Sequence, residues 1–287
     1  MLIVQVFVHV LPDTVDAFLA ATQGLLEQHE AANNLMLGIA LRLAQSPSQA
    51  APPPYLATVN DEQGLVIAAL MTPPHNLVVH SDRAAYGEAP ALLLQHLLAA
   101  GYTAPGVLGP KPIARACAEA WSAASGRAWQ PGMLQRVYEL RQVSPIRYSP
   151  GRLRPAETAD RDLVAAWAVA FHEEAGIPGT PGEVGEALQR RVAAGDVYVW
   201  EHGRPVSMAA RSRPTRHGIT VNLVYTPPEL RRQGYATSCV AALSQRLLDS
   251  GYRLCTLFTD LANPTSNDIY QQIGYRPVCD FDEYVFL

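Results

Sequence analysis

The residues with the clearest chemical potential lie in a turn between an apolar segment and an amphipathic one. Residues 222–236 read NLVYTPPELRRQGYA, so a strand would end near Thr226 and a helix would open at Arg231–Ala236. The first backbone N–H groups of a helix have no partner within it and lie at the positive end of its dipole. Because Gly234 lets a bulky anion approach the backbone, the pattern predicts an anion site. An ordinary solvated helix start is the competing interpretation. A P-loop is excluded, since no Gly-Lys-Ser/Thr follows.

A second motif, NPTSNDIYQQIGY, spans residues 263–275. Asn263 suits a helix N-cap and Pro264 suits the first helical position. Asn267 and Tyr270 are three residues apart and would share one helical face. Tyr270 could therefore serve a site on that face, or it could pack as a partly buried aromatic against a sheet.

The other reactive side chains form no recognisable metal or nucleophile motif. The eight histidines lack HExxH spacing, and the four cysteines lack CxxC spacing. Cys239 and Cys255 would lie on a core helix and a core strand, where a small apolar residue fits. We therefore expect no metal cofactor, no cysteine nucleophile, and reduced thiols in a cytoplasmic protein.

The string Arg231-Arg232-Gln233-Gly234-Tyr235-Ala236 after a strand resembles the Arg/Gln-x-x-Gly-x-Gly/Ala signature of the GNAT family of acyl-CoA-dependent N-acyltransferases. The resemblance covers roughly residues 152–287, from the segment LRPAETADRDL to the closing IGYRPV. Ala236, where many members have glycine, is the one departure. The resemblance implies a mixed, mainly antiparallel sheet with helices on both faces. Two of its central strands would splay apart to admit the pantetheine arm of coenzyme A (CoA).

The resemblance also implies which residues bind acetyl-CoA. The diphosphate would lie on the turn and helix start, formed by Arg231, Arg232, Gln233, Gly234, Tyr235, Ala236 and Thr237. The pantetheine amides would pair with the strand end, formed by Leu223, Val224, Tyr225 and Thr226, and an amide at or beside Val224 could stabilise charge on the thioester oxygen. Asn263, Asn267 and Tyr270 would contact CoA from the later helix.

Two further roles follow from the same resemblance. Tyr270 would lie beside the sulfur and act as the general acid that protonates the departing thiolate. The general base is harder to assign: Glu173 and Glu174, with His172 beside them, end the first helix of this half, near where acceptors of the family enter. An exposed Glu-Glu pair is also typical of a solvated helix surface.

The elements that would position these residues are present twice. Residues 93–102 (LLQHLLAAGY) and 243–252 (LSQRLLDSGY) are identical at six of ten positions, and Gly101 and Gly251 each fit the residue that ends a helix. Each half would run strand, helices, three strands, helix, strand, helix and a final pair of strands. We therefore predict an α+β protein of two GNAT-like domains, residues 1–145 and 146–287, divided at the Pro- and Gly-rich segment 143–154.

The first half lacks the chemistry of the second. Its equivalent turn, VHSDRAAYGEAPAL at 79–92, contains one arginine and two acidic residues, and Cys117 and Trp121 occupy its last helix where tyrosine chemistry would be expected. We therefore interpret 1–145 as a degenerate copy that no longer binds CoA and walls one side of the acceptor cleft. The catalytic domain would be 146–287.

Composition limits the remaining classes of function. The 287 residues are 48% hydrophobic and 17% charged with a net charge of -4, which indicates a globular protein and argues against nucleic acid or an anionic membrane surface as partner. The apolar N-terminal stretch is too short to span a membrane.

The most economical reading is an N-acetyltransferase that moves an acetyl group from acetyl-CoA to a small-molecule or peptide amine by direct attack. The alternatives are a non-catalytic acyl-CoA sensor and a tandem-GNAT aminoacyl or long-chain acyl transferase. The sequence leaves the acceptor and the oligomeric state open.

Overall fold

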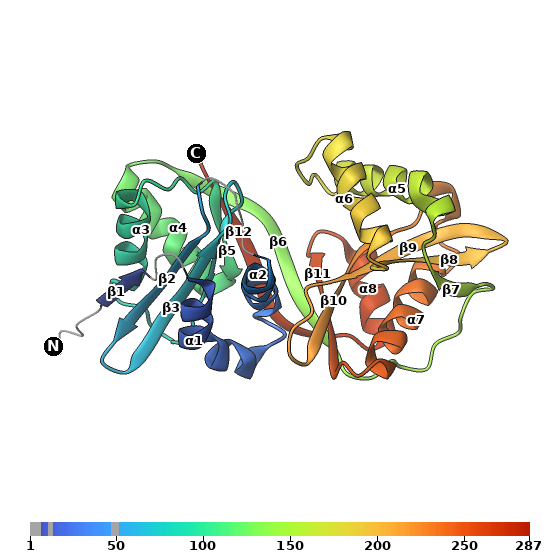
Figure 1. Cartoon of the computed structure of the whole chain (residues 1–287), viewed down its shortest axis with the longest axis horizontal. Helices are drawn as coiled ribbons and strands as arrows, with labels where there is room; N and C mark the ends of the chain where they lie inside the picture. Colours follow the sequence, from blue (N-terminus) through green and yellow to red (C-terminus); the bar gives the residue numbers. More distant parts are fainter. Residues whose placement is uncertain (1–6, 11–13, 47–51) are drawn as a thin grey trace. The chain divides into compact units, whose positions relative to one another are not determined.

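The computed structural model describes residues 7–10, 14–46 and 52–287 and divides into two units (Figure 1). Unit 1 contains the chain up to Val137 together with Thr259–Ala262 and Pro277–Leu287, and unit 2 contains Tyr138–Phe258 and Asn263–Arg276. In the described part of the chain, no helix combines the length and the apolar character that crossing a membrane requires.

The order of elements is the same in both halves of the sequence. The first half consists of β1 (Phe7–Val10), α1 (Val15–Leu26), the 3-10 helix η1 (Glu27–His29), α2 (Asn34–Gln45), β2 (Tyr55–Asp61), β3 (Gly64–Met71), β4 (Leu77–His80), α3 (Ala89–Ala99), β5 (Gly106–Pro110), α4 (Lys111–Ser125) and β6 (Trp129–Leu140). The second half consists of β7 (Arg152–Pro155), η2 (Thr158–Asp160), α5 (Arg161–Glu174), α6 (Pro181–Ala193), β8 (Val197–His202), β9 (Arg204–Ser212), β10 (Gly218–Tyr225), η3 (Pro228–Leu230), α7 (Tyr235–Asp249), β11 (Leu254–Asp260), α8 (Pro264–Ile273) and β12 (Arg276–Phe286).

This order confirms the duplication and corrects one detail of it. Each half ends in one long strand, β6 or β12, and not in a pair of strands. Pro131 and Gly132 lie inside β6 without ending it. Gly101 and Gly251, at the ends of the two similar helices, have the positive φ angles of 78° and 109° expected of residues that close a helix.

In unit 1 the strands run in the order β1-β2-β3-β4-β5-β12. All neighbouring pairs are antiparallel except β4 and β5, which are parallel. The strand β12, although last in the sequence, pairs with β5 and places Tyr284 and Phe286 in the core of unit 1, where Phe286 stacks on Trp121 at 4.3 Å. Conversely, Tyr138 and Leu140 at the end of β6 pack in the core of unit 2. The units therefore exchange strand ends and are not separated by a single cut at 145/146.

In unit 2 the strands β11-β10-β9-β8-β7 follow one another, with β10 and β11 parallel and the other pairs antiparallel. Side chains of β8 and β9 alternate between two apolar clusters: Val199 and Met208 pack with α5 and α6, whereas Trp200 and Val206 pack with α7 and α8. One helix pair therefore covers each face of the sheet (Figure 1).

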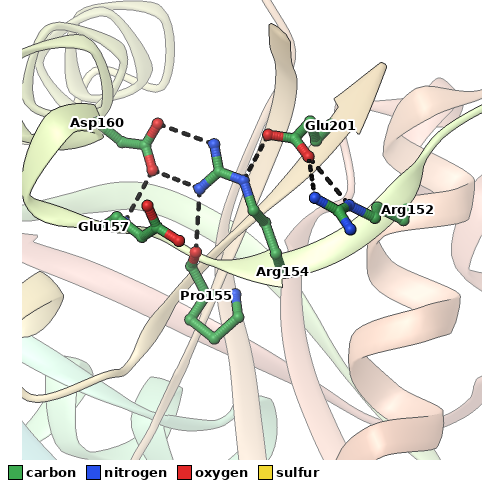
Figure 2. A network of polar contacts seen from close by, with 6 residues as sticks. All are labelled: Arg152, Arg154, Pro155, Glu157, Asp160 and Glu201. Atoms are coloured by element: carbon green, nitrogen blue, oxygen red, sulfur yellow. Dashed lines mark hydrogen bonds and ion pairs between the residues drawn. The ribbon is translucent and has the colours of Figure 1, made fainter. Parts of the chain in front are cut away.

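The edge strand β7 is joined to the following helix by ion pairs (Figure 2). The Arg154 guanidinium lies between Asp160, at 2.5 Å, and Glu201, at 2.6 Å, and Arg152 contacts Glu201 from the other side at 2.9 Å. Asp160 also accepts a hydrogen bond from the backbone N–H of Glu157 at 2.8 Å. The hydrogen bonds from Arg154 hold the pKa of the buried Asp160 carboxyl below its usual value.

Candidate functional site

The strand β10 is irregular at the residues expected to meet a thioester. Its pairing with β9 shifts register between Asn222↔Ala210 and Tyr225↔Met208, so Leu223 and Val224 form a bulge, and Leu223 has a φ of +49°. The bulge reverses the side-chain alternation. Val224 packs on the α7/α8 side, whereas Leu223 and Tyr225 pack on the α5/α6 side.

The neighbouring strand separates from β10 at the same level. The parallel pairing of β10 with β11 consists of three pairs and ends at Thr220↔Thr256, whose hydroxyls are 3.0 Å apart and buried. Beyond Thr220 the backbone of β10 therefore has no registered partner on the β11 side. This is the divergence of two central strands that the sequence resemblance implied, and it leaves peptide groups of β10 available to a ligand.

Buried hydroxyl groups hold the end of β10. Thr226 donates from Oγ1 to Ser207 Oγ at 2.9 Å, and Ser207 donates to the carbonyl oxygen of Tyr225 at 3.1 Å. Ser207 is fully buried and Thr226 is nearly so. The strand end is thereby fixed where the turn to α7 begins.

The turn leads into a helix start with no side-chain cap. Gly234, the N-cap of α7, has a φ of +75°, and the first helical hydrogen bond runs from Ser238 N–H to its carbonyl oxygen. The N–H groups of Tyr235, Ala236 and Thr237 therefore have no partner within the helix. A Cβ at Gly234 would lie 2.7 Å from Ser149 Oγ, which donates to the carbonyl oxygen of Gln233. This compact cradle of free N–H groups suits a diphosphate.

The two arginines of the turn have different surroundings. Arg231 donates from Nε to the carbonyl oxygen of Thr226 at 2.9 Å and from Nη2 to both carboxylate oxygens of Glu174, at 2.8 and 2.7 Å. Its guanidinium also lies 5.7 Å from the ring centre of Tyr225. Arg232 has a φ of +62° and is exposed, and it has no hydrogen bond or ion pair within the described ranges. Arg232 is thus the guanidinium with all its donors available to an anion.

Gln233 and Tyr235, on either side of Gly234, have opposite surroundings. Tyr235 is buried, with its hydroxyl 2.9 Å from Nδ1 of His202, and it begins α7. Gln233 is exposed. Tyr235 therefore anchors the helix start to the sheet, whereas Gln233 faces solvent beside Arg232.

The later motif forms α8 as expected. Asn263 is its N-cap and accepts from the N–H of Ser266 at 3.1 Å, which confirms the predicted cap. The side chain of Asn267 donates to the carbonyl oxygen of Asn263 at 2.8 Å and accepts from the hydroxyl of Tyr138 at 3.0 Å. Gln271 also approaches that hydroxyl, at 3.5 Å. Tyr138 therefore ties the end of β6 to α8.

Tyr270 lies on the inner side of α8. Its side chain is 8% exposed, belongs to the same apolar cluster as Val224, and meets Tyr275 edge-on with ring centres 6.0 Å apart. Burial raises the pKa of the Tyr270 hydroxyl to about 12. Like an ordinary tyrosine, Tyr270 is therefore protonated at neutral pH, so it has a proton to donate.

The candidate bases at the end of α5 face different neighbours. Glu174 is bound by Arg231 and accepts from the Tyr225 hydroxyl at 3.2 Å, and burial together with the nearby Glu174 carboxylate raises the pKa of Tyr225. Glu173 is exposed and, with His172, lines a pocket between α5 and α6. Among the described residues, no group of three or more His, Cys, Asp or Glu side chains is arranged to hold a metal ion.

Three residues of the site carried no signal in the sequence. Ser149, Ser207 and Tyr138 fix the turn, the strand end and α8 respectively. Each is a common polar residue far from the motifs in the chain. Folding alone brings it into contact with them, so spacing could not have identified it.

The equivalent places in unit 1 differ in their arginine and in the approach of the strands. Arg83, the one arginine of that turn, donates to the carbonyl oxygen of Leu65 and to the side chains of Gln63 and Asp61. The strands β4 and β5 pair at Leu77↔Val107 and Val78↔Leu108 and remain close one residue further on, where a Cβ at Gly109 would clash with the carbonyl oxygen of Val79.

Comparison with known proteins agrees with this geometry. Residues 201–286 match the family model described as FR47-like protein, a GNAT-type family. No curated protein has significant sequence similarity to the chain.

Similar solved structures extend the likeness to the whole chain. A GCN5-related N-acetyltransferase from Sphaerobacter thermophilus has a TM-score of 0.65 at 14% identity, with 97% of this chain and 94% of that one covered. A GNAT-family acetyltransferase from Colwellia psychrerythraea has a TM-score of 0.59 at 11% identity, with 98% and 100% covered. A tandem GNAT protein from the clavulanic acid biosynthesis pathway has a TM-score of 0.50 at 13% identity, with 99% and 98% covered. The resemblance read from the arginine-glycine turn is thereby confirmed: this chain has a tandem GNAT fold, and residues 201–286 resemble the FR47-like, GNAT-type family.

Proposed function

We propose that the protein is an acyltransferase of the acetyl-CoA-dependent N-acetyltransferase type, and that the site in unit 2 carries out the reaction. The observation that supports this most directly is the combination of a bulged, diverging β10 with an uncapped start of α7. The first offers peptide groups to an extended amide-bearing arm, and the second offers N–H groups to a diphosphate.

Each group would have a separate task. The N–H groups of Tyr235, Ala236 and Thr237 would bind the diphosphate, with Arg231 and Arg232 adding positive charge. Peptide groups of Leu223–Thr226 would pair with the pantetheine amides. Asn263 and Asn267 would contact CoA from α8.

Transfer would proceed by direct attack of a neutral amine on the thioester carbonyl. The C–N bond forms, the C–S bond breaks, and the sulfur leaves with the bonding electrons. An amide N–H at Val224 would stabilise charge on the carbonyl oxygen, which is worth a few kcal/mol in a preorganised site. Tyr270, whose hydroxyl is protonated at neutral pH, would protonate the sulfur. Glu173, Glu174 or a water held by either would accept the proton of the amine.

We further propose that the two halves have divided roles, with residues 146–287 supplying the chemistry and 1–145 a degenerate copy without CoA. The occupied Arg83 and the close contact of β4 with β5 support this division.

The decisive experiment adds one negative charge to the helix start. We expect Ala236→Glu to weaken CoA binding by about 100-fold, because a carboxylate in the first turn of α7 repels the diphosphate. The same carboxylate favours the helix, so the unfolding temperature should hold or rise. The matched control, Ala91→Glu in the first turn of α3, should leave CoA binding unchanged. Calorimetric titration with CoA checks both.

If Ala236→Glu binds CoA as tightly as the parent protein does, CoA does not bind at this helix start. With CoA binding established, thiol release from acetyl-CoA in the presence of an amine panel identifies the enzyme. CoA binding with no thiol release for any amine would favour the acyl-CoA sensor. A strong preference for longer acyl-CoA thioesters would favour the long-chain acyl transferase.

A further inference from the structure

The pocket at the end of α5 is a second place in unit 2 where a ligand could bind. Its cavity volume is about 60 Å³, where about 10–15 Å³ is enough to hold one water molecule. Its walls are apolar, formed by Val169, Ile177, Pro181 and Val184. A short aliphatic group therefore fits against them.

One polar atom facing this region is unsatisfied. Nδ1 of His172 is buried and has no hydrogen-bond partner among the described residues. Leaving such an atom unpaired costs about 1–3 kcal/mol, so its presence requires an explanation. A Cβ at Gly179 would lie 3.7 Å from this nitrogen and 3.1 Å from Val184. The glycine thus keeps open the space in front of the imidazole.

The available charge in the pocket is negative. Glu173 lines it and is exposed, with no ion pair in the described part of the chain. The neighbouring carboxylates are occupied: Glu174 by Arg231, and Glu183 by the hydroxyl and N–H of Thr180 in the cap of α6. A free carboxylate, an imidazole nitrogen that can accept a hydrogen bond and apolar walls together select a ligand with an ammonium group on a short aliphatic chain.

The pocket lies close to the proposed site of transfer. His172, Glu173 and Glu174 belong to the last turn of α5, and Glu174 contacts both Tyr225 at the end of β10 and Arg231. Successive residues of one helical turn therefore line the pocket and contact the end of β10.

We propose that this pocket binds the distal end of the acceptor, and that the acceptor is an aliphatic diamine. This inference rests on the proposed function. One nitrogen stays protonated between Glu173 and His172 while the other, as the free base, attacks the thioester. The alternative, in which Glu173 and Glu174 are only a solvated surface at a helix end, does not explain the unsatisfied Nδ1 of His172.

The first test compares a diamine with a monoamine. We expect the full-length protein to acetylate 1,4-diaminobutane with a kcat/KM at least 10-fold above that for butylamine. Glu173→Gln should abolish that preference by raising KM for the diamine, so that the two amines are used equally well. Val184→Phe, which fills the pocket, should do the same. Glu186→Gln, an exposed change on α6, is the neutral control, and Glu174→Gln should retain the preference because its carboxylate serves Arg231.

The second test needs no turnover. Calorimetric titration with 1,4-diaminobutane should show binding by the parent protein and loss of at least 10-fold in affinity in Glu173→Gln and Val184→Phe, with unfolding temperatures unchanged. Diamine binding that depends on Glu173 without any acetyl transfer would support the pocket and overturn the proposed function. Acetyl transfer with equal preference for the two amines, unaffected by Glu173→Gln, would overturn the pocket and leave the proposed function intact.

Discussion

The turns that follow β4 and β10 occupy the same place in the two copies and differ in what they leave free. Both following helices begin without a side-chain cap, but after β10 Arg232 stays unpaired within the described residues. After β4, Arg83 folds back onto the hairpin of β2 and β3, and His80 is paired with Asp82 at 2.9 Å. The second turn offers a guanidinium outwards, whereas the one arginine of the first turn is bonded to the neighbouring hairpin.

The strands that precede the two turns, β4 and β10, also differ in how regularly they pair. The strand β10 carries a bulge and leaves β11 after Thr220↔Thr256. The strand β4 pairs without interruption to β3 as far as His80, and it stays close to β5 at Gly109. The duplicated order of elements thus preserves a scaffold, and the two copies differ in a few local departures from regular pairing, which support the proposal that unit 2 binds CoA.

The largest expected difference between the copies concerns the last helix. Tyr270 is seven residues after the N-cap of α8, and Cys117 holds the same place in α4. We expect Tyr270→Phe to lower turnover by at least about 100-fold with little change in CoA affinity, because only proton donation is lost. Cys117→Ala in unit 1 should leave turnover unchanged. Steady-state kinetics with a separate CoA titration measures both, and unchanged turnover in Tyr270→Phe would remove it from the mechanism.

A smaller difference concerns the first strand and helix of each copy. In unit 2, Asp160 is buried beside Arg154, whereas in unit 1 Thr14 caps α1 without a side-chain hydrogen bond and Asp16 is exposed. We expect Asp160→Asn to lower the free energy of unfolding by about 1–3 kcal/mol at pH 7 and Asp16→Asn to have little effect.

The sign of the pH dependence follows from the lowered pKa of Asp160. The stabilisation is complete above the pKa of the unfolded chain, about 4, and is lost as the pH falls through the lower pKa of the folded state. The Asp160→Asn difference should therefore shrink below pH 4. Urea unfolding at pH 7 and at pH 3 measures it, and an undiminished difference at the lower pH would mean that the charge of Asp160 is not its cause.

The smallest expected difference involves two tyrosines at the exchanged strand ends. Tyr138 of β6 donates to Asn267 on α8, whereas Tyr284 of β12 donates to Asp282 on its own strand. We expect Tyr138→Phe to raise the KM for acetyl-CoA several-fold, since Asn267 loses the hydrogen bond that orients it. Tyr284→Phe should leave that KM unchanged. An equal effect of both substitutions would assign Tyr138 a purely structural role.

The sequence by itself determined the repeated order of elements, the turn chemistry at Gly234 and the cap at Asn263. These features are local: apolar periodicity, glycine tolerance and capping act over a few residues, so they are legible along the chain. The prediction of a final pair of strands in each half was wrong, because β6 and β12 are each one long strand, and β6 continues through Pro131 and Gly132.

Only the tertiary structure decided which of the candidate side chains already form ion pairs within the protein. Glu173 and Glu174 are adjacent and alike in sequence, yet one lines a pocket and the other binds Arg231, 57 residues away. The exchange of strand ends, which brings Tyr138 to α8 and Phe286 to Trp121, is equally invisible in spacing. Such contacts join residues distant in the chain, and they depend on how the sheet registers and twists when the core closes, which no local pattern encodes.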